Sequence, residues 1–200
     1  MGSEFKNTMD EYFKSESFKK IIEDAVQNAV EKKFKEMEEK VKHLEEENEK
    51  LTNQIDDLEQ YGRRNNIKIY GIQKVDPKNL EKEVVKEINK KAGASIVSSQ
   101  IEACHYLDKN KTSVIVRFVS RKTRDDVYYL KKNLKGTRIS ITEDLTKKKY
   151  QLLKECQKHF EKRSLWTKYG VVKLHLNGKV HNIKNMKALE DLKKMKRNTQ

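Results

Sequence analysis

Residues 58–72 read Leu-Glu-Gln-Tyr-Gly-Arg-Arg-Asn-Asn-Ile-Lys-Ile-Tyr-Gly-Ile, and they join two different kinds of sequence. Before this joint, apolar residues recur with the spacing of a coiled coil. After it, short alternating and helical patterns indicate a small basic domain of strands and helices. The pair Arg63 and Arg64 connects the two parts. This layout predicts several copies of a basic module that are held together on one stalk.

The charged residues are unevenly distributed along the chain. The 200 residues have a formal net charge of +14. Residues 1–60 contain 10 Lys/Arg and 17 Asp/Glu, a net charge of −7, whereas residues 61–200 contain 35 and 14, a net charge of +21. An acidic stalk followed by a basic body predicts a polyanionic partner for the body. Nucleic acid is favoured over a membrane surface.

Several classes of protein are disfavoured by the composition. No apolar run approaches the ~20 residues that span a bilayer, and no signal-peptide core is present, so we expect no membrane span. Cys104 and Cys156 lie far apart without the spacing of a zinc site, which predicts reduced thiols, no metal and no cofactor in a cytoplasmic or nuclear protein. The first five residues look like a cloning scar, and we expect residues 1–8 to be disordered.

Residues 9–62 are predicted to form the helical stalk. Its apolar positions alternate in steps of four and three, which is the heptad pattern of a left-handed coiled coil. The a positions are Phe34, Val41, Asn48 and Ile55, and the d positions are Val30, Met37, Leu44, Leu51 and Leu58. A lone amphipathic surface helix is the alternative, but the stripe is narrow, long and flanked by charge. Upstream apolar residues are out of phase, which indicates a stutter or a helical cap.

The number of chains in the coiled coil stays open between two and three. Val and Ile at a, Leu at d and one buried Asn48 favour a parallel dimer. In contrast, Lys40-Val41-x-x-Leu44-Glu45 resembles a motif associated with trimers, and Phe34 suits a wider core. We therefore predict self-association as a homotrimer or a homodimer.

Residues 63–142 carry the pattern of an α+β domain. The predicted elements are a strand at 66–72, a helix from Pro77 to Gly93, strands at 100–107 and 112–120, a helix at 123–134 and a strand at 138–142. The order βαββαβ is that of RNA-recognition modules. The fold class is therefore α+β, with an N-terminal parallel coiled coil, an RRM-like domain and a small C-terminal domain.

The open face of the predicted sheet lacks the aromatic platform of such modules. It carries Lys68, Tyr70, Arg117 and Arg138 instead. Such a face would hold the phosphate backbone of a nucleic acid more than it would stack bases. The alternative is a ferredoxin-like fold whose charged sheet is merely solvated.

Residues 143–200 are predicted to form the C-terminal α-hairpin-α domain. A helix at 145–162 precedes a loop at 166–169, a hairpin at 171–183 and a helix at 186–195. Asn177-Gly178 between two alternating runs is a strong hairpin signal. The loop interleaves Trp166 and Tyr169 with Lys168, so it could stack on bases, although Trp166 could equally fill a core. Glu143 and Asp144 at a strand-to-helix junction are interpreted as helix-capping acids.

The joint and the order of parts resemble a known family. They are similar to the first-open-reading-frame protein of LINE-type retrotransposons, and also to the few-polyhedra (FP) protein of baculoviruses. The resemblance covers roughly residues 30 to 195, and its most specific segments are 58–72, 114–118 and 141–146. It implies trimers, binding of single-stranded RNA without strong sequence preference, and a nucleic-acid chaperone that packages its own transcript. By position, Arg117 and Arg138 look like RNA-contacting residues of that family, and Lys168 and Lys173 match more loosely.

We therefore expect a non-catalytic protein that binds single-stranded RNA, or single-stranded DNA, with low sequence specificity. No catalytic motif and no small-molecule substrate are indicated. The candidate nucleic-acid-binding residues are Arg63, Arg64, Lys68, Tyr70, Arg117, Arg121, Arg138, Lys168 and Lys173. The alternative is a structural or regulatory viral protein of the few-polyhedra type, which acts in virion occlusion through coiled-coil partners.

Overall fold

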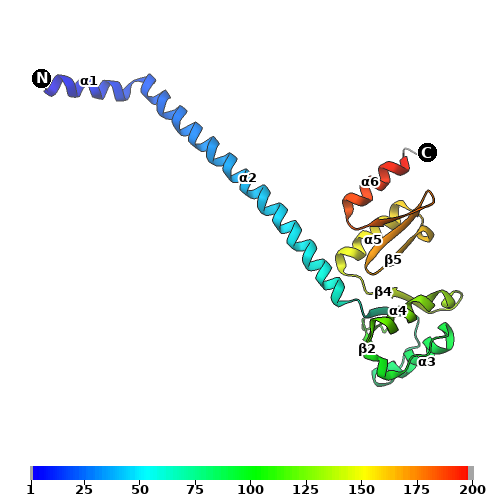
Figure 1. Cartoon of the computed structure of the whole chain (residues 1–200). Helices are drawn as coiled ribbons and strands as arrows, with labels where there is room; N and C mark the ends of the chain where they lie inside the picture. The colour runs from blue at the N-terminus through cyan, green and yellow to red at the C-terminus, as the bar shows by residue number, and fades with distance from the viewer. Residues whose placement is uncertain (1, 198–200) are drawn as a thin grey trace. The chain divides into compact units, whose positions relative to one another are not determined.

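The structure is a computed structural model that describes residues 2–197, and it divides into two compact units between Gln54 and Ile55. The division lies earlier in the chain than the predicted end of the stalk at residue 62. The first unit is helical, and the second contains all the strands (Figure 1).

The first unit consists of helix α1 (Gly2–Lys14) and most of helix α2 (Glu16–Gly62). The prediction of disorder over residues 1–8 is wrong for residues 2–8, which lie in α1; Met1 lies outside the described residues. The two helices are separated at Ser15, whose hydroxyl accepts a hydrogen bond from the Phe18 N–H at 3.2 Å. The Phe18 ring lies 5.5 Å from that of Tyr12 and 5.0 Å from that of Phe13. Of the out-of-phase apolar residues, Phe18 therefore belongs to an aromatic cluster at a helical break, whereas Ile22, Ala25, Val26 and Ala29 lie further along α2.

The heptad side chains of α2 are exposed in the single chain. Their exposed fractions run from 43% at Val30 to 71% at Leu58. Each of the predicted oligomerisation residues is exposed: Val30, Phe34, Met37, Val41, Leu44, Asn48, Leu51, Ile55 and Leu58. A contiguous apolar stripe of this kind on a helix is typical of an interaction surface.

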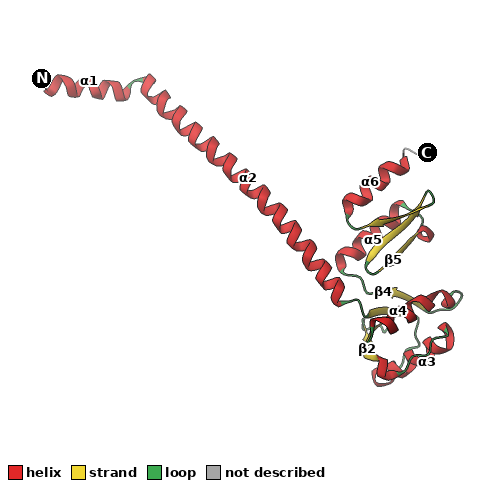
Figure 2. Ribbon diagram, in the orientation of Figure 1, coloured by secondary structure: helices red, strands yellow, loops and turns green. Residues whose placement is uncertain are grey.

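The second unit begins with a four-stranded antiparallel sheet in the order β2-β3-β1-β4. Figure 2 shows the strands in yellow and the helices in red. The elements of this part are β1 (Asn66–Tyr70), the 3-10 turn η1 (Pro77–Asn79), α3 (Leu80–Ala92), the 3-10 turn η2 (Ser98–Gln100), β2 (Ile101–Tyr106), β3 (Ser113–Phe118), α4 (Arg121–Tyr129), the 3-10 helix η3 (Leu130–Leu134) and β4 (Ser140–Glu143). The order of strands and helices is the predicted one.

Local chemistry sets the limits of these elements. Gly93 has φ +73° and ends α3, because glycine adopts the left-handed conformation without a steric penalty. The Ser120 hydroxyl accepts a hydrogen bond from the Lys122 N–H at 3.1 Å and starts α4 before the predicted residue 123. Ile67 and Ile69 are fully buried in the core beneath α3 and α4, while Lys68 and Tyr70 point to the other face as predicted.

The prediction that a strand begins at Arg138 is wrong. Strand β4 begins at Ser140, and Arg138 lies in the preceding segment. Its charge acts on Glu87 of α3 and helps to lower the pKa of that carboxyl, although the hydrogen bond from Lys91 is the larger cause. Arg138 therefore lies before strand β4, and its charge acts on the Glu87 carboxylate of α3.

The chain ends with helix α5 (Lys147–His159), the 3-10 turn η4 (Lys162–Ser164), strands β5 (Leu165–Lys168), β6 (Val171–Leu176) and β7 (Lys179–Ile183), and helix α6 (Met186–Arg197). The strands form an antiparallel sheet in the order β5-β6-β7, and α5 and α6 pack on it around a second core. Asn177 and Gly178 have φ +50° and +75°, as a two-residue type I′ turn requires.

The prediction of a loop at 166–169 is wrong. Trp166, Thr167 and Lys168 belong to β5 and pair with β6. Tyr169 and Gly170 form the turn between these strands, with φ +56° and +74°. Trp166 is half-buried and lies opposite Lys173.

The predicted α+β fold class is confirmed at the level of a long N-terminal helix followed by antiparallel sheets and helices. Among residues 2–197, no helix combines the length and the apolar character that crossing a membrane requires.

Candidate nucleic-acid interface

A buried ion pair links the four-stranded sheet to the C-terminal hairpin. The Glu143 carboxylate, at the end of β4, accepts a hydrogen bond from Arg124 Nη2 of α4 at 2.9 Å. The same carboxylate accepts the backbone N–H groups of Tyr169 at 2.8 Å and Gly170 at 3.2 Å. Both side chains of the pair are at least 96% buried, so the hydrogen bonds replace the water that each charge has lost.

The next residue, Asp144, forms ion pairs with Arg63 and Lys68 of the joint. Its carboxylate lies 2.9 Å from Arg63 Nη1 and 2.8 Å from Lys68 Nζ, and it accepts a hydrogen bond from Asn66 Nδ2 at 3.0 Å. Burial opposes ionisation of this group. However, the hydrogen bonds from Lys68 and Asn66 and the charges of Lys68 and Arg63 outweigh burial and lower the pKa of Asp144.

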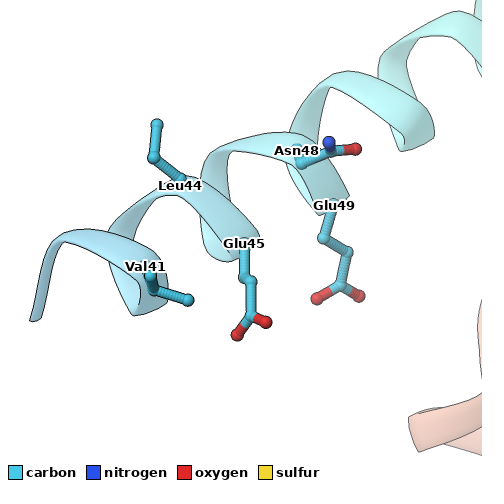
Figure 3. Close-up of a pocket in the computed structure, with 5 residues that line it drawn as sticks. All are labelled: Val41, Leu44, Glu45, Asn48 and Glu49. Carbon is cyan, nitrogen blue, oxygen red and sulfur yellow. The ribbon is translucent and has the colours of Figure 1, made fainter. Parts of the chain in front are cut away.

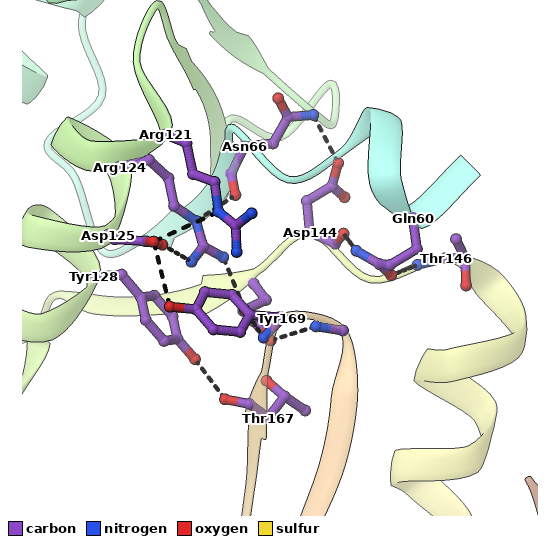
Figure 4. Close-up of polar contacts among 12 residues, drawn as sticks. Gln60, Asn66, Arg121, Arg124, Asp125, Tyr128, Asp144, Thr146, Thr167 and Tyr169 are labelled. Carbon is purple, nitrogen blue, oxygen red and sulfur yellow. Dashed lines mark hydrogen bonds and ion pairs between the residues drawn. The ribbon is translucent and has the colours of Figure 1, made fainter. Parts of the chain in front are cut away.

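Gln60, in the last turn of α2, connects the same region to α5. Its Nε2 donates to the Asp144 carbonyl oxygen at 3.0 Å, and its Oε1 accepts the Thr146 N–H at 3.0 Å (Figure 4). Gly170 is packed against Gln60, because a Cβ at that glycine would lie 2.5 Å from the Gln60 Cγ. The end of α2 is thus a structural part of the second unit.

The interpretation of Glu143 and Asp144 as helix-capping acids is wrong. The N-cap of α5 is Thr146, whose hydroxyl accepts the Lys149 N–H at 3.3 Å. The two carboxylates bind arginine, lysine and backbone N–H groups instead. Their partners lie far away in the sequence, so the local pattern could not reveal this role.

Four of the predicted nucleic-acid-binding cations have a carboxylate partner within the chain: Arg63, Lys68, Arg117 and Arg121. Arg63 and Lys68 share Asp144, and their side chains are only 32% and 25% exposed. Arg117 lies on the open face of the sheet and pairs with Glu102 at 3.0 Å, with both side chains about half exposed. An exposed pair of this kind contributes little stability, so Arg117 can exchange its partner for a phosphate at small cost.

Other predicted residues carry no carboxylate partner. Among residues 2–197, Arg64, Arg138 and Lys168 have no carboxylate within ion-pair distance. The Arg64 guanidinium lies over the exposed Tyr61 ring, 3.7 Å from its centroid. Tyr70 is 38% exposed on the open face of the sheet.

The remaining predicted residues lie around the β5–β6 turn. The Arg121 guanidinium lies 4.6 Å from the centre of the Tyr169 ring and 3.7 Å from Asp125. Lys168 Nζ lies 5.4 Å from the same ring centre. Lys173 Nζ donates to Asn182 Oδ1 at 2.7 Å on the neighbouring strand. The structure therefore brings Arg121 and Lys168 together, whereas Lys173 contacts β7.

The sequence analysis did not single out Arg124 and Tyr128. Arg124 is 3% exposed, and Tyr128 donates its hydroxyl to the Thr167 carbonyl oxygen at 3.3 Å. One signal in the sequence could have indicated Arg124. This residue stands three residues before Val127, on the apolar face of the predicted helix, and a buried arginine requires a carboxylate partner.

Both cysteines are free thiols; Cys156 is buried and Cys104 is partly buried. Burial raises the pKa of Cys104 to about 12 and that of Cys156 to about 11, so both thiols are protonated at neutral pH. Within residues 2–197, no three His, Cys, Asp or Glu side chains lie close enough together to bind a metal ion.

The stalk has a shallow surface depression on α2. It is lined by Val41, Leu44, Glu45, Asn48 and Glu49, which project from the helix (Figure 3). The Asn48 amide oxygen accepts a hydrogen bond from the Thr52 hydroxyl at 3.3 Å. These residues include three of the heptad positions, so the depression belongs to the apolar stripe.

No protein-family model matches this sequence, and no curated protein matches it either. The residues and contacts described above therefore carry the functional proposal.

Proposed function

We propose that this protein is an oligomeric single-stranded RNA-binding protein with low sequence specificity. The observation that carries the proposal is the separation of charge. Residues 61–200 have a net charge of +21, and Arg64, Arg138 and Lys168 are exposed without a carboxylate partner among residues 2–197. Each phosphate contact of such cations releases counterions, which gives affinity that depends steeply on salt.

We propose that the exposed heptad stripe of α2 forms a parallel coiled coil of two or three chains. The stripe supports this because its apolar side chains have no cover within the single chain. An oligomer presents two or three basic bodies to one strand. The second contact is then intramolecular, so the avidity exceeds the affinity of one body.

The order and pairing of β1–β4 and the two helices α3 and α4 support an RRM-like domain. Its open face presents Lys68, Tyr70 and Arg117 and lacks a set of stacking aromatics. We propose that this face, together with Arg138, contacts the phosphate backbone, because phosphate contacts carry no base information. A nucleic-acid chaperone that packages RNA, as the resemblance to LINE-type proteins implies, fits this weak specificity.

The direct test is fluorescence anisotropy with labelled single-stranded RNA of two lengths and a duplex of the longer one. We expect tight binding that increases with strand length, falls steeply with salt and prefers single strands. Weak binding that does not increase with length would contradict the proposal.

The sheet face is tested by replacing Arg117 and Arg138 together with alanine. We expect an affinity loss of about tenfold or more and a salt dependence that is shallower by about 1.4, since two phosphate contacts are lost on a single strand. The matched control is Lys162→Ala with Arg163→Ala, which removes two exposed charges from η4. Equal losses in both variants would mean that only net charge matters.

The second candidate is a scaffold of the few-polyhedra type that acts through coiled-coil partners. The exposed stripe on α2 is the observation that favours it. In that case RNA binding would be weak, and helical peptides of matching heptad pattern would compete with self-association.

A further inference from the structure

Aromatic and basic side chains of α4, η3 and β5 lie near the β5–β6 turn. The Tyr128 hydroxyl of α4 donates to Thr167 on β5 at 3.3 Å, and the Tyr169 hydroxyl lies 3.5 Å from Asp125 Oδ2 of α4 (Figure 4). These contacts fix the turn against the helix. We name the surface formed by Arg121, Tyr128, Lys131, Lys168 and Tyr169 the tyrosine patch. We include Tyr129, which follows Tyr128 in α4 and has Lys132 Nζ 4.8 Å from its ring centre.

Cations lie over the rings of the patch. Lys131 Nζ lies 3.8 Å from the centre of the Tyr128 ring, and Arg121 and Lys168 lie 4.6 and 5.4 Å from that of Tyr169. Despite these neighbours, the Tyr169 residue remains 52% exposed, and Tyr129 is 74% exposed. The patch therefore offers accessible aromatic surface and positive charge side by side.

The backbone at Tyr169 gives an independent indication of function. Its φ of +56° is left-handed, which is unfavourable for a bulky side chain, and asparagine or glycine is the usual choice at this position of a type I′ turn. The other two-residue turn of the same sheet follows that preference with Asn177 at φ +50°. Because the Tyr169 ring is half exposed, burial alone does not account for the unfavourable residue, and such outliers point to a functional role.

Acidic side chains do not cancel the charge of the patch. Asp125 lies 2.8 Å from Arg124 and 3.7 Å from Arg121, so its charge is shared between two arginines. Asp126 is exposed on α4, and within residues 2–197 no cation lies within ion-pair distance of it. Against these acids, Arg121, Lys131 and Lys168 supply three cations.

We propose that the tyrosine patch is a second contact site of the nucleic acid, at which unpaired bases stack on Tyr169 and Tyr129. Arg121, Lys131 and Lys168 contact the adjacent phosphates. The combination of exposed rings with cations is the chemistry that binds single strands independently of sequence. The site deepens the proposed function and rests on it. It differs from the sheet face, where Tyr70 is the exposed aromatic of β1 and phosphate contacts are expected to dominate.

The test uses the full chain and two labelled probes of equal length, an oligouridylate and an abasic strand. Tyr169→Asn removes the ring and keeps a residue that tolerates the left-handed backbone, and it is combined with Tyr129→Ala. We expect the double variant to bind the oligouridylate about tenfold more weakly, with unchanged binding to the abasic strand. Tyr169→Phe should retain the affinity for both strands.

The matched control is Tyr150→Ala, which removes an exposed tyrosine of α5 that also lies near a lysine, Lys154 at 5.4 Å. This variant should bind both probes like the unchanged protein. If Tyr169→Asn prevents folding, Tyr129→Ala alone provides the same comparison of probes.

The outcomes separate this inference from the proposed function. If the unchanged protein binds the oligouridylate and the double variant binds it equally well, only the stacking site is wrong. An equal loss on both probes would also overturn stacking, because an abasic strand has no base to stack. If the unchanged protein binds neither probe, both the function and the site are wrong.

Discussion

Leucine side chains are exposed on the stalk helix and buried in the second unit. Leu44 on α2 is 59% exposed, whereas Leu174 on β6 is fully buried in the second core. Burying a leucine is worth roughly 1.5–3 kcal/mol. The second unit obtains this energy within one chain, through two separate cores.

In the proposed coiled coil, the stalk obtains this energy from another chain. An isolated helix in water gains little from propensity, so most of its stability has to come from packing of its apolar face. If the proposed coiled coil forms, the stability of the stalk depends on protein concentration, whereas that of the second unit does not. The four predictions below test this separation, starting with the largest expected effect.

Replacing Leu44 and Leu51 together with proline should abolish self-association. Each proline inside a helix costs about 3 kcal/mol or more and removes a core position. The second unit should keep its cooperative thermal unfolding. Analytical ultracentrifugation measures the association state, and Glu46→Ala with Glu49→Ala, which changes positions off the seam, is the matched control. An oligomer that survives the prolines would show that association does not depend on the stripe.

Replacing Arg124 with leucine should destabilise the second unit by about 3–5 kcal/mol, because it leaves Glu143 charged and buried without its partner. The association of the stalk should not change. The control is Arg117→Leu, which breaks another Arg–Glu pair, but one with about half of each side chain exposed. That change should cost less than about 1 kcal/mol. Chemical denaturation compares the two variants, and equal costs would rule out a special role for the buried pair.

Replacing Gly170 with alanine should cost about 2 kcal/mol, and replacing Gly178 about 1 kcal/mol. Both glycines are left-handed, with φ +74° and +75°, so both variants carry the backbone penalty. A Cβ at Gly170 also meets Gln60 at 2.5 Å, whereas one at Gly178 meets nothing within 4 Å. The difference between the two melting temperatures therefore reports the packing of Gln60, and identical values would show that Gln60 yields freely.

The smallest effect is expected at the β2–β3 loop, and only at acid pH. Hydrogen bonds from the Thr112 N–H and the Ser113 hydroxyl lower the pKa of Asp108 to about 2, from an ordinary value of 3.8. Since the folded-state pKa is the lower one, Asp108 stabilises the fold above pH 4, and this contribution is lost as the pH falls from about 4 to about 2. The unfolding free energies of Asp108→Asn and the unchanged protein should therefore converge over this range. A difference that stays constant would exclude ionisation as the cause.

The elements with strong local signals were predictable. Gly93 ends α3 and Asn177-Gly178 forms a hairpin turn, because only a few residues tolerate those backbone angles. Strand β5 could not be predicted, because the turn that follows it lacks the usual residue types. Its turn places tyrosine where asparagine is expected, so the sequence around Tyr169 lacks the signal of a two-residue turn.

The alternation of β1 correctly placed Lys68 and Tyr70 on the face opposite the core. The partners of the charged residues were not predictable in the same way. Asp144 binds Arg63 and Lys68, and Glu143 binds Arg124, across separations that depend on how the strands are paired. A sequence of charges gives their number but not which of them neutralise one another.

The contacts of Gln60 define where the protein can be cut and recombined. Its side chain donates to the Asp144 carbonyl oxygen and accepts the Thr146 N–H. The last two turns of α2 are therefore part of the second unit and cannot be exchanged together with the stalk. A body-only chain that starts at Gly62 would lose a hydrogen-bond donor and an acceptor at a buried position. A foreign coiled coil that replaces the stalk should be fused before Ile55, which leaves the Gln60 hydrogen bonds intact. The number of chains in the foreign coiled coil would then set the number of basic bodies per assembly.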